Sequence, residues 1–253
     1  MAPVAAPVIG GLLTGSVGWQ GIFMILLFIG ILLGIGCIRF KESLPAEKRS
    51  KTGVWATFRS FGIIVHNRRY MLYVFQLAFA QGILFAYIAS SPFIIQQHYG
   101  FSPFAFSICF AVNAVAIGVA AALSVKFRRT ENGTLTGCVG MLVFAVLQMA
   151  ALYSGCGFWT YELLMFALLF MMGLTFTAST TLAMDCERRY AGAASALLGA
   201  LCFASGGIVS PLVGLGDILI STGVTFVICA VCSLLCALWA VKRTGPKVAL
   251  CRI

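Results

Sequence analysis

Polar side chains interrupt several long apolar runs of this 253-residue chain, and the residues that could do chemistry are among them. On a helix with about 3.6 residues per turn, one face of residues 70–93 carries amide and aromatic groups. Such groups bind other molecules through hydrogen bonds and ring contacts, either in a cavity or on a neighbouring helix, and both interpretations stay open. The candidates on this face are Tyr73, Gln76, Phe79 and Tyr87.

Three further polar residues belong to this set of candidates for lining a cavity. Asn113 is the most polar residue of 105–125 and could contact a ligand or hold two helices together. Thr175 and Ser179 share a helical face of 163–184. Because hydroxyls inside a helix often bond to a carbonyl one turn earlier, that structural interpretation is the favoured one for this pair.

The sequence offers no constellation for catalysis or metal binding. His66 and His98 are far apart and lack a neighbouring cysteine or carboxylate at ligand spacing. Cys229, Cys232 and Cys236 resemble a ligand cluster, but their surroundings are apolar, so free thiols are favoured. We expect no catalytic residue, metal or cofactor, and we do not expect an enzyme.

The amino-acid composition indicates that this chain lies in a lipid bilayer. Hydrophobic residues make up 61% and charged residues 9%, against roughly 45 to 50% and about 25% in soluble domains. Together with a mean hydropathy of +1.02, this excludes a soluble globular protein, a disordered chain and a coiled coil. An uncharged run of about 20 residues can span a bilayer as a helix. We predict an all-α integral membrane protein with an incomplete span at 1–17 and seven complete ones at 21–38, 70–93, 105–125, 135–153, 163–184, 191–215 and 218–241.

The charged residues are distributed unevenly between the connections. All 17 Lys and Arg residues lie in every second connection and in the C-terminal tail, whereas the connections around Gly18, Gln97, Gly155 and Asp217 have none. Basic residues accumulate on the cytoplasmic side of membrane proteins, so we expect a cytoplasmic C-terminus and need no nucleic-acid partner to explain the net charge. The acidic residues Glu162 and Asp185, like Asp217, end spans, where we expect interface residues rather than proton carriers.

The long basic connection at 39–69 divides the chain into two spans and six. We therefore assign 1–38 to the end of one half, 39–69 to a central cytoplasmic loop and 70–253 to a second, complete half. An amphipathic stretch with Trp55, Phe58 and Phe61 is expected at the lipid interface. For the first part of the loop, a disordered linker is an equal alternative.

A short pattern recurs in the two parts. Ala6-Pro7-Val8-Ile9-Gly10 and Ser210-Pro211-Leu212-Val213-Gly214 share a small residue, a proline, two apolar residues and a glycine. Both copies fall on spans that cross in the same direction. Parallel repeats of this kind are typical of transporters built from two six-helix halves.

Four stretches of the chain, at 6–11, 42–49, 99–114 and 191–197, carry a family resemblance. The first, Ala-Pro-Val-Ile-Gly-Gly, is similar to the Gly-Pro-x-x-Gly-Gly signature of antiporters, and Glu42-Ser43-Leu44-Pro45 is similar to a Glu-Thr-Leu-Pro motif that opens the central loop. The chain thereby resembles the major facilitator superfamily, and within it the Bcr/CflA drug-resistance exporters.

The resemblance implies a function. It covers family helices five to twelve, so we expect the first four helices to be missing from this chain. The complete protein would export drugs or small metabolites by alternating access in exchange for protons, as a monomer in a bacterial inner membrane. Its partners would be a small-molecule substrate, the proton and the lipid bilayer. The alternative is a nontransporting membrane scaffold or an inactive transporter fragment.

The resemblance also implies a contact between helices. Family helices five and eight pack where the two halves meet, and small residues permit close approach in lipid. The expected contact joins the signature helix, whose motif includes Gly10, to the span at 105–125, with Pro7, Gly11 and Gly15 on one side and Ala114, Gly118 and Ala122 on the other.

Overall fold

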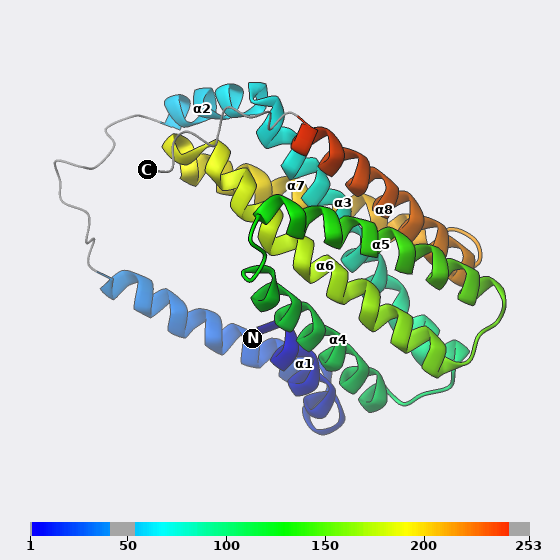
Figure 1. Ribbon diagram of the computed structural model, residues 1–253. Helices are drawn as coiled ribbons and strands as arrows, with labels where there is room; N and C mark the ends of the chain where they lie inside the picture. Colours follow the sequence, from blue (N-terminus) through cyan, green and yellow to red (C-terminus); the bar gives the residue numbers. More distant parts are fainter. Residues whose placement is uncertain (1, 41–53, 243–253) are drawn as a thin grey trace.

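The computed structural model describes residues 2–40 and 54–242, except for the side chains of 2–9, 11–12, 14–16 and 54–59. Within this part of the chain every regular element is a helix, which confirms the predicted fold class (Figure 1). The elements in order are α1 (Ala2–Arg39), α2 (Val54–His66), α3 (Arg68–Pro92), the π-helix η2 (Phe93–His98), α4 (Pro103–Ser124), α5 (Thr130–Tyr153), α6 (Phe158–Cys186), the 3-10 helix η3 (Arg188–Tyr190), α7 (Ala191–Val213) and α8 (Ile218–Lys242).

The helices agree with the predicted spans. In the described part of the chain, 7 are long and apolar enough to cross a membrane, and they correspond to the seven complete spans. The main difference lies after Pro92, where the span was expected to end at residue 93. The chain instead continues as the π-helix Phe93–His98, so this element reaches about one turn further.

Helix α1 consists of two segments joined at Gly18. The backbone of Gly18 has φ 64° and ψ −178°, a conformation that glycine adopts without steric cost. The first segment packs against α4. The second leads away from the other helices (Figure 1), and its side chains from Phe23 to Ile38 are exposed. The division of the chain at 38 and 69 stays a prediction.

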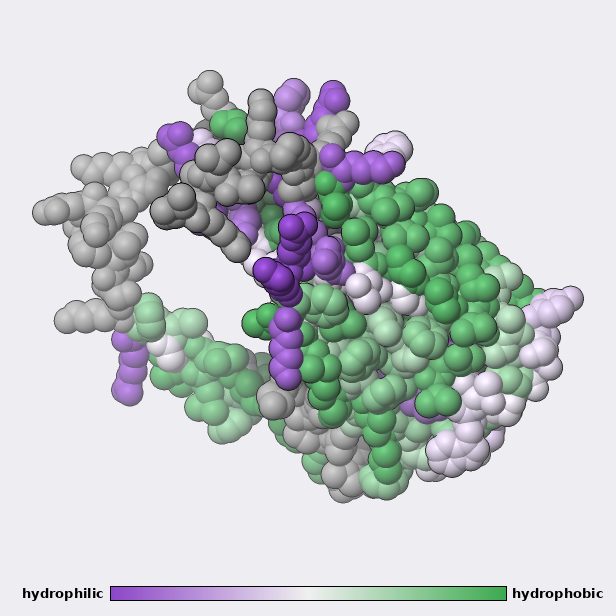
Figure 2. Space-filling view, in the orientation of Figure 1, coloured by the Kyte–Doolittle hydropathy of each residue, from purple (hydrophilic) through white to green (hydrophobic). Residues whose placement is uncertain are grey.

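Helices α3 to α8 form a bundle around α3. Helix α3 packs on α6, α7 and α8, while α5 lies against α6 and α8, and α4 lies against α6. The largest completely buried side chains include Tyr73, Tyr87, Tyr161 and Phe226. Outside, apolar side chains cover the flanks of the bundle (Figure 2), as lipid-facing helices require.

Polar contacts gather four helix ends at one end of the bundle. Asn67 caps α3 and donates from Nδ2 to Glu187 at the end of α6, at 2.6 Å. Arg69 lies 3.6 Å from Glu131 at the start of α5. The Tyr70 hydroxyl donates to the carbonyl of residue 194 in α7, at 2.6 Å. Hydrophilic side chains gather near this end of the bundle (Figure 2); which side of a membrane this end faces stays a prediction.

The predicted amphipathic stretch is the helix α2, which contacts α3 and α7. Ile64 is completely buried and Phe61 is half-buried. The side chains of Trp55 and Phe58 lie outside the described residues, and the lipid-interface position of all three aromatic residues stays a prediction.

Candidate functional site

Gln76 lies at the centre of a polar network that joins four helices. Its Nε2 atom lies within hydrogen-bond distance of Ser233 Oγ on α8 at 3.1 Å and Thr175 Oγ1 on α6 at 3.2 Å. Cys138 Sγ on α5 is at 3.4 Å. The amide has two N–H groups, so it satisfies two of these three acceptors at a time. Ser233 Oγ also donates to the Gln76 carbonyl at 3.2 Å. Gln76 is completely buried, and this geometry corresponds to the helix-joining interpretation.

The hydroxyls of Thr175 and Ser179 bond to α5. Thr175 Oγ1 donates to the Thr134 carbonyl at 3.2 Å, and Ser179 Oγ lies 3.1 Å from Thr134 Oγ1. The favoured expectation of bonds to their own helix is therefore wrong for this pair. Thr180 and Thr181, which face away from the core, do make such bonds. The difference arises because α5 offers buried acceptors, which the sequence of α6 alone does not reveal.

The other residues of the candidate face on α3 are spread along the bundle. Tyr73 is completely buried near the basic end, and the Arg69 guanidinium lies 5.9 Å from the centre of its ring. Phe79 is half-buried. Tyr87 is buried near the opposite end, where Phe110 stacks on its ring at 5.5 Å. The structure thus brings Gln76 and Thr175 together but not Tyr73 and Tyr87, and a cavity lined by these residues stays a prediction.

Tyr87 belongs to a second polar cluster, formed by α3, α4 and α6. Asn113 Nδ2 donates to Tyr87 Oη at 3.0 Å and to Glu162 Oε1 at 2.8 Å. Asn113 and Tyr87 are each 1% exposed, and Glu162 is half-buried. The second carboxylate oxygen of Glu162 is buried and has no hydrogen-bond partner in the described residues. Glu162 is thus less exposed to water than expected for a residue at a span end, and its place at the membrane interface stays a prediction.

The other two acidic residues at span ends match that expectation. Asp185 is exposed and pairs with Arg188 at 2.9 Å. Asp217 is exposed and accepts from the backbone N–H groups of Leu219 and Ile220 at the start of α8. Both carboxylates have partners outside the core. Glu162 therefore differs from them in its surroundings, although all three occupy similar places in the sequence.

The expected contact of α1 with α4 is present between the helices. On α4, Ala114 is buried, while Gly118 and Ala122 are exposed. Gly10 is half-buried, and the burial of Pro7, Gly11 and Gly15 is not described, so their pairing with α4 stays a prediction. The described close approach of α4 is to α6, where a Cβ atom on Gly173 would lie 2.6 Å from the Ile117 carbonyl oxygen.

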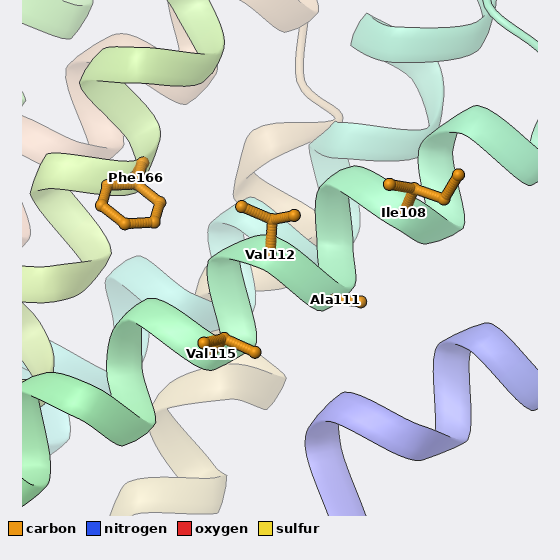
Figure 3. A pocket seen from close by; sticks show the side chains of 5 residues that line it. All are labelled: Ile108, Ala111, Val112, Val115 and Phe166. Atoms are coloured by element: carbon orange, nitrogen blue, oxygen red, sulfur yellow. The ribbon is translucent and has the colours of Figure 1, made fainter.

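An apolar groove lies on α4 and α6 (Figure 3). It has a volume of about 390 Å³. Its lining comes from one face of α4 and from Phe166 of α6, with α1 nearby. Phe166 lies one turn after Glu162 on α6, so the two share a face of the helix. The lining residues are Ile108, Ala111, Val112, Val115 and Phe166.

The fold and these clusters can be compared with known proteins. The family model described as Major Facilitator Superfamily matches residues 1–211. The chain belongs to the Major Facilitator Superfamily. It is therefore a multi-pass membrane protein of a transporter family, and not an enzyme.

Relatives within this superfamily refine the assignment. The chain is 36% identical over 224 residues to the "Uncharacterized MFS-type transporter YdgK" of Bacillus subtilis, which covers 86% of the chain and 56% of the relative. It is 28% identical over 227 residues to the "Bicyclomycin resistance protein homolog" of Haemophilus influenzae, covering 84% and 54%. A "Multidrug transporter MdfA" of Edwardsiella ictaluri is 26% identical over 104 residues, covering 41% and 25%.

These matches support the resemblance to the Bcr/CflA drug-resistance subfamily. The chain spans about half the length of the first two relatives. Cys138, Ser233 and Glu162 were not among the predicted site residues. A buried glutamine requires partners on other helices, and that requirement is the signal that could have pointed to Cys138 and Ser233.

Proposed function

We propose that this chain is the substrate-handling part of a membrane exporter for drugs or small metabolites, which works by alternating access and exchanges its substrate for protons. The observation that carries the proposal is the match to a protein named for bicyclomycin resistance, which is 28% identical and covers 84% of the chain. The bundle of α3 to α8 corresponds to one of the two halves that rock against each other in such transporters. The proposed orientation places the basic end and the C-terminus in the bacterial cytoplasm.

The packing of the bundle supports the proposal that its helices move as one rigid unit. The Gln76 network joins α3, α5, α6 and α8, so these helices would move together. The apolar groove on α4 and α6 is instead open at the surface, and α1 lies nearby. A substrate that binds between two halves needs such a surface facing the other half. Apolar and aromatic lining suits hydrophobic compounds.

The proposal can be tested by completing the chain. Cells that lack their own drug exporters would produce the chain joined to the part of the Bacillus subtilis relative that the match leaves uncovered. We expect preloaded ethidium to leave these cells faster than control cells, and a protonophore to abolish the difference. The chain alone is expected to export nothing, because alternating access needs two halves.

The scaffold alternative predicts the opposite result. If the completed protein is present in the membrane at normal amounts and ethidium leaves no faster than from control cells, the transporter proposal fails. Export by the chain alone would contradict the requirement for two halves. A negative control is the same fusion with Gly173→Val, which should export nothing because the added side chain would overlap Ile117 and Ala120 of α4.

A further inference from the structure

Buried oxygen atoms around Glu162 lack hydrogen-bond partners. They are Glu162 Oε2, Asn113 Oδ1 and Tyr161 Oη, none of which has a partner in the described part of the chain. Asn113 and Tyr161 are at most 1% exposed. Buried polar groups in proteins are usually hydrogen-bonded, so these oxygens are free to bind a further group. Each of the three can accept a hydrogen bond, and the cluster therefore suits a positively charged or proton-donating ligand.

No described cation compensates the Glu162 carboxylate. The ion pairs among the described residues are those of Arg69 and Arg188, both at the basic end. The titratable groups that surround Glu162 are Tyr87 of α3, Cys109 of α4 and Tyr161 of α6. All three are neutral when protonated. Helix α5 also packs on α6, and its charged residue, Glu131, lies at its other end, near Arg69.

The end of the cluster is covered by aromatic rings. Phe101 lies over Phe158 with ring centres 4.2 Å apart, and Tyr99 lies 5.8 Å from Tyr161. The Tyr99 hydroxyl donates to the Cys156 carbonyl at 2.9 Å, which fixes this cover. Glu162 itself is half-buried, and the groove begins one turn further along α6 at Phe166. Glu162 thus follows the covered start of α6 and precedes by one turn the residue of α6 that lines the groove.

We propose that Glu162, held by Asn113 and Tyr87, is a binding site for one positive charge, taken either as a proton or as the cationic group of a compound in the α4–α6 groove. Protonation forms an O–H bond between a proton from water and Glu162 Oε2, and the neutral acid then donates to a neighbouring unpaired oxygen. A cationic group meets the same oxygens as acceptors. The proton and the cationic group cannot occupy Glu162 at the same time, and such competition is what an exchange of substrate for protons requires. The choice of an organic cation rests on the proposed function; the proton site does not.

The proton arm is tested on the purified chain in lipid nanodiscs by infrared difference spectroscopy during acidification. We expect a protonated-carboxyl band that is absent in Glu162→Gln and retained in the matched control Asp217→Asn, whose carboxylate is exposed. Glutamine keeps an oxygen to accept from Asn113, so the fold should persist, and circular dichroism checks this. An unchanged band in Glu162→Gln overturns the proton arm.

The cation arm uses ethidium binding to the same nanodiscs, measured by fluorescence polarisation. We expect Glu162→Gln to weaken ethidium binding at least tenfold at neutral pH, and acidification to weaken it in the wild type but not in the variant. A band that depends on Glu162 together with unchanged ethidium binding would assign the site to the proton alone. If neither measurement depends on Glu162, the proposal is wrong. Failure of export by the completed transporter leaves both measurements interpretable, so it is distinguishable from failure of this site.

Discussion

The contact of α4 with α6 at Gly173 gives the sharpest test of the packing. A Cβ atom on Gly173 would lie 2.6 Å from the Ile117 carbonyl oxygen, 2.9 Å from Ala120 Cβ and 3.0 Å from Ile117 Cα. Ordinary contacts begin at 3.4 Å. All three neighbours are backbone atoms or a methyl group, which cannot rotate away. Gly173→Ala must therefore push α4 back by most of an ångström.

The expected cost follows from this overlap. Overpacking of a filled core costs about 1 to 3 kcal/mol, whereas replacing a helical glycine by alanine gains about 1 kcal/mol through helix propensity. The control Gly207→Ala isolates the first effect, because Gly207 is exposed on α7 and nothing lies within 4 Å of its Cβ position. We expect Gly173→Ala to be less stable than Gly207→Ala by about 1 to 3 kcal/mol.

The assay is equilibrium unfolding in mixed micelles with a rising fraction of sodium dodecyl sulfate, followed by circular dichroism. Adding Ala120→Gly to Gly173→Ala removes one of the three close contacts, so it should restore part of the loss and not all of it. Equal free energies of unfolding for Gly173→Ala and Gly207→Ala would refute the close approach of these helices.

Three further predictions concern the core, the threading and the aromatic cover. Gln76→Leu should lower the free energy of unfolding by about 1 kcal/mol, since each buried hydrogen bond between membrane helices contributes about 0.6 kcal/mol. The control is Gln81→Leu, because Gln81 is half-buried on the same helix. Equal free energies of unfolding for the two variants in the same micelle assay would contradict the Gln76 network. The orientation is tested with single cysteines introduced into a cysteine-free chain, at the exposed positions Ser154 and Arg128. A membrane-impermeant maleimide applied to intact cells should label Ser154→Cys and not Arg128→Cys. The reverse labelling would show that the proposed orientation in the membrane is inverted. Burial and the hydrogen bond to Cys156 raise the pKa of Tyr99, while the unfolded chain ionises near pH 10. The stability that the neutral Tyr99 hydroxyl contributes is therefore complete below about pH 10 and is lost above it. Unfolding measured at about pH 9 and about pH 11 should show a larger loss for the wild type than for Tyr99→Phe, and equal losses would contradict the burial.

The spans could be predicted because the bilayer leaves the backbone few choices. A run such as 135–153 contains no charge, and in hydrocarbon its N–H and C=O groups are satisfied only within a helix. Length and composition therefore fix where a helix lies along the chain. They do not fix how it is rotated about its axis, because almost every face of such a helix is apolar.

The rotation of α4 about its axis decides which of its faces packs on α6. The spacing of Ala114, Gly118 and Ala122 is that of a close helix contact, yet Gly118 and Ala122 are exposed. The neighbouring face, with Ala116 and Ala120, is buried instead, and it meets Gly173 of α6. Both faces carry small residues, so the sequence of α4 cannot distinguish them. The glycine on the partner helix decides which face is used.

Glu162 shows why distance from a span end is a poor measure of depth. It is the fifth residue of α6, a position that hydropathy places at the membrane surface. The depth of a residue depends on how far the neighbouring helices extend, however, and α3 is prolonged by the π-helix to His98. The chain that follows places Tyr99 and Phe101 over the start of α6, against Phe158. Glu162 is thereby half-buried, and its carboxylate acquires surroundings that only the tertiary structure creates.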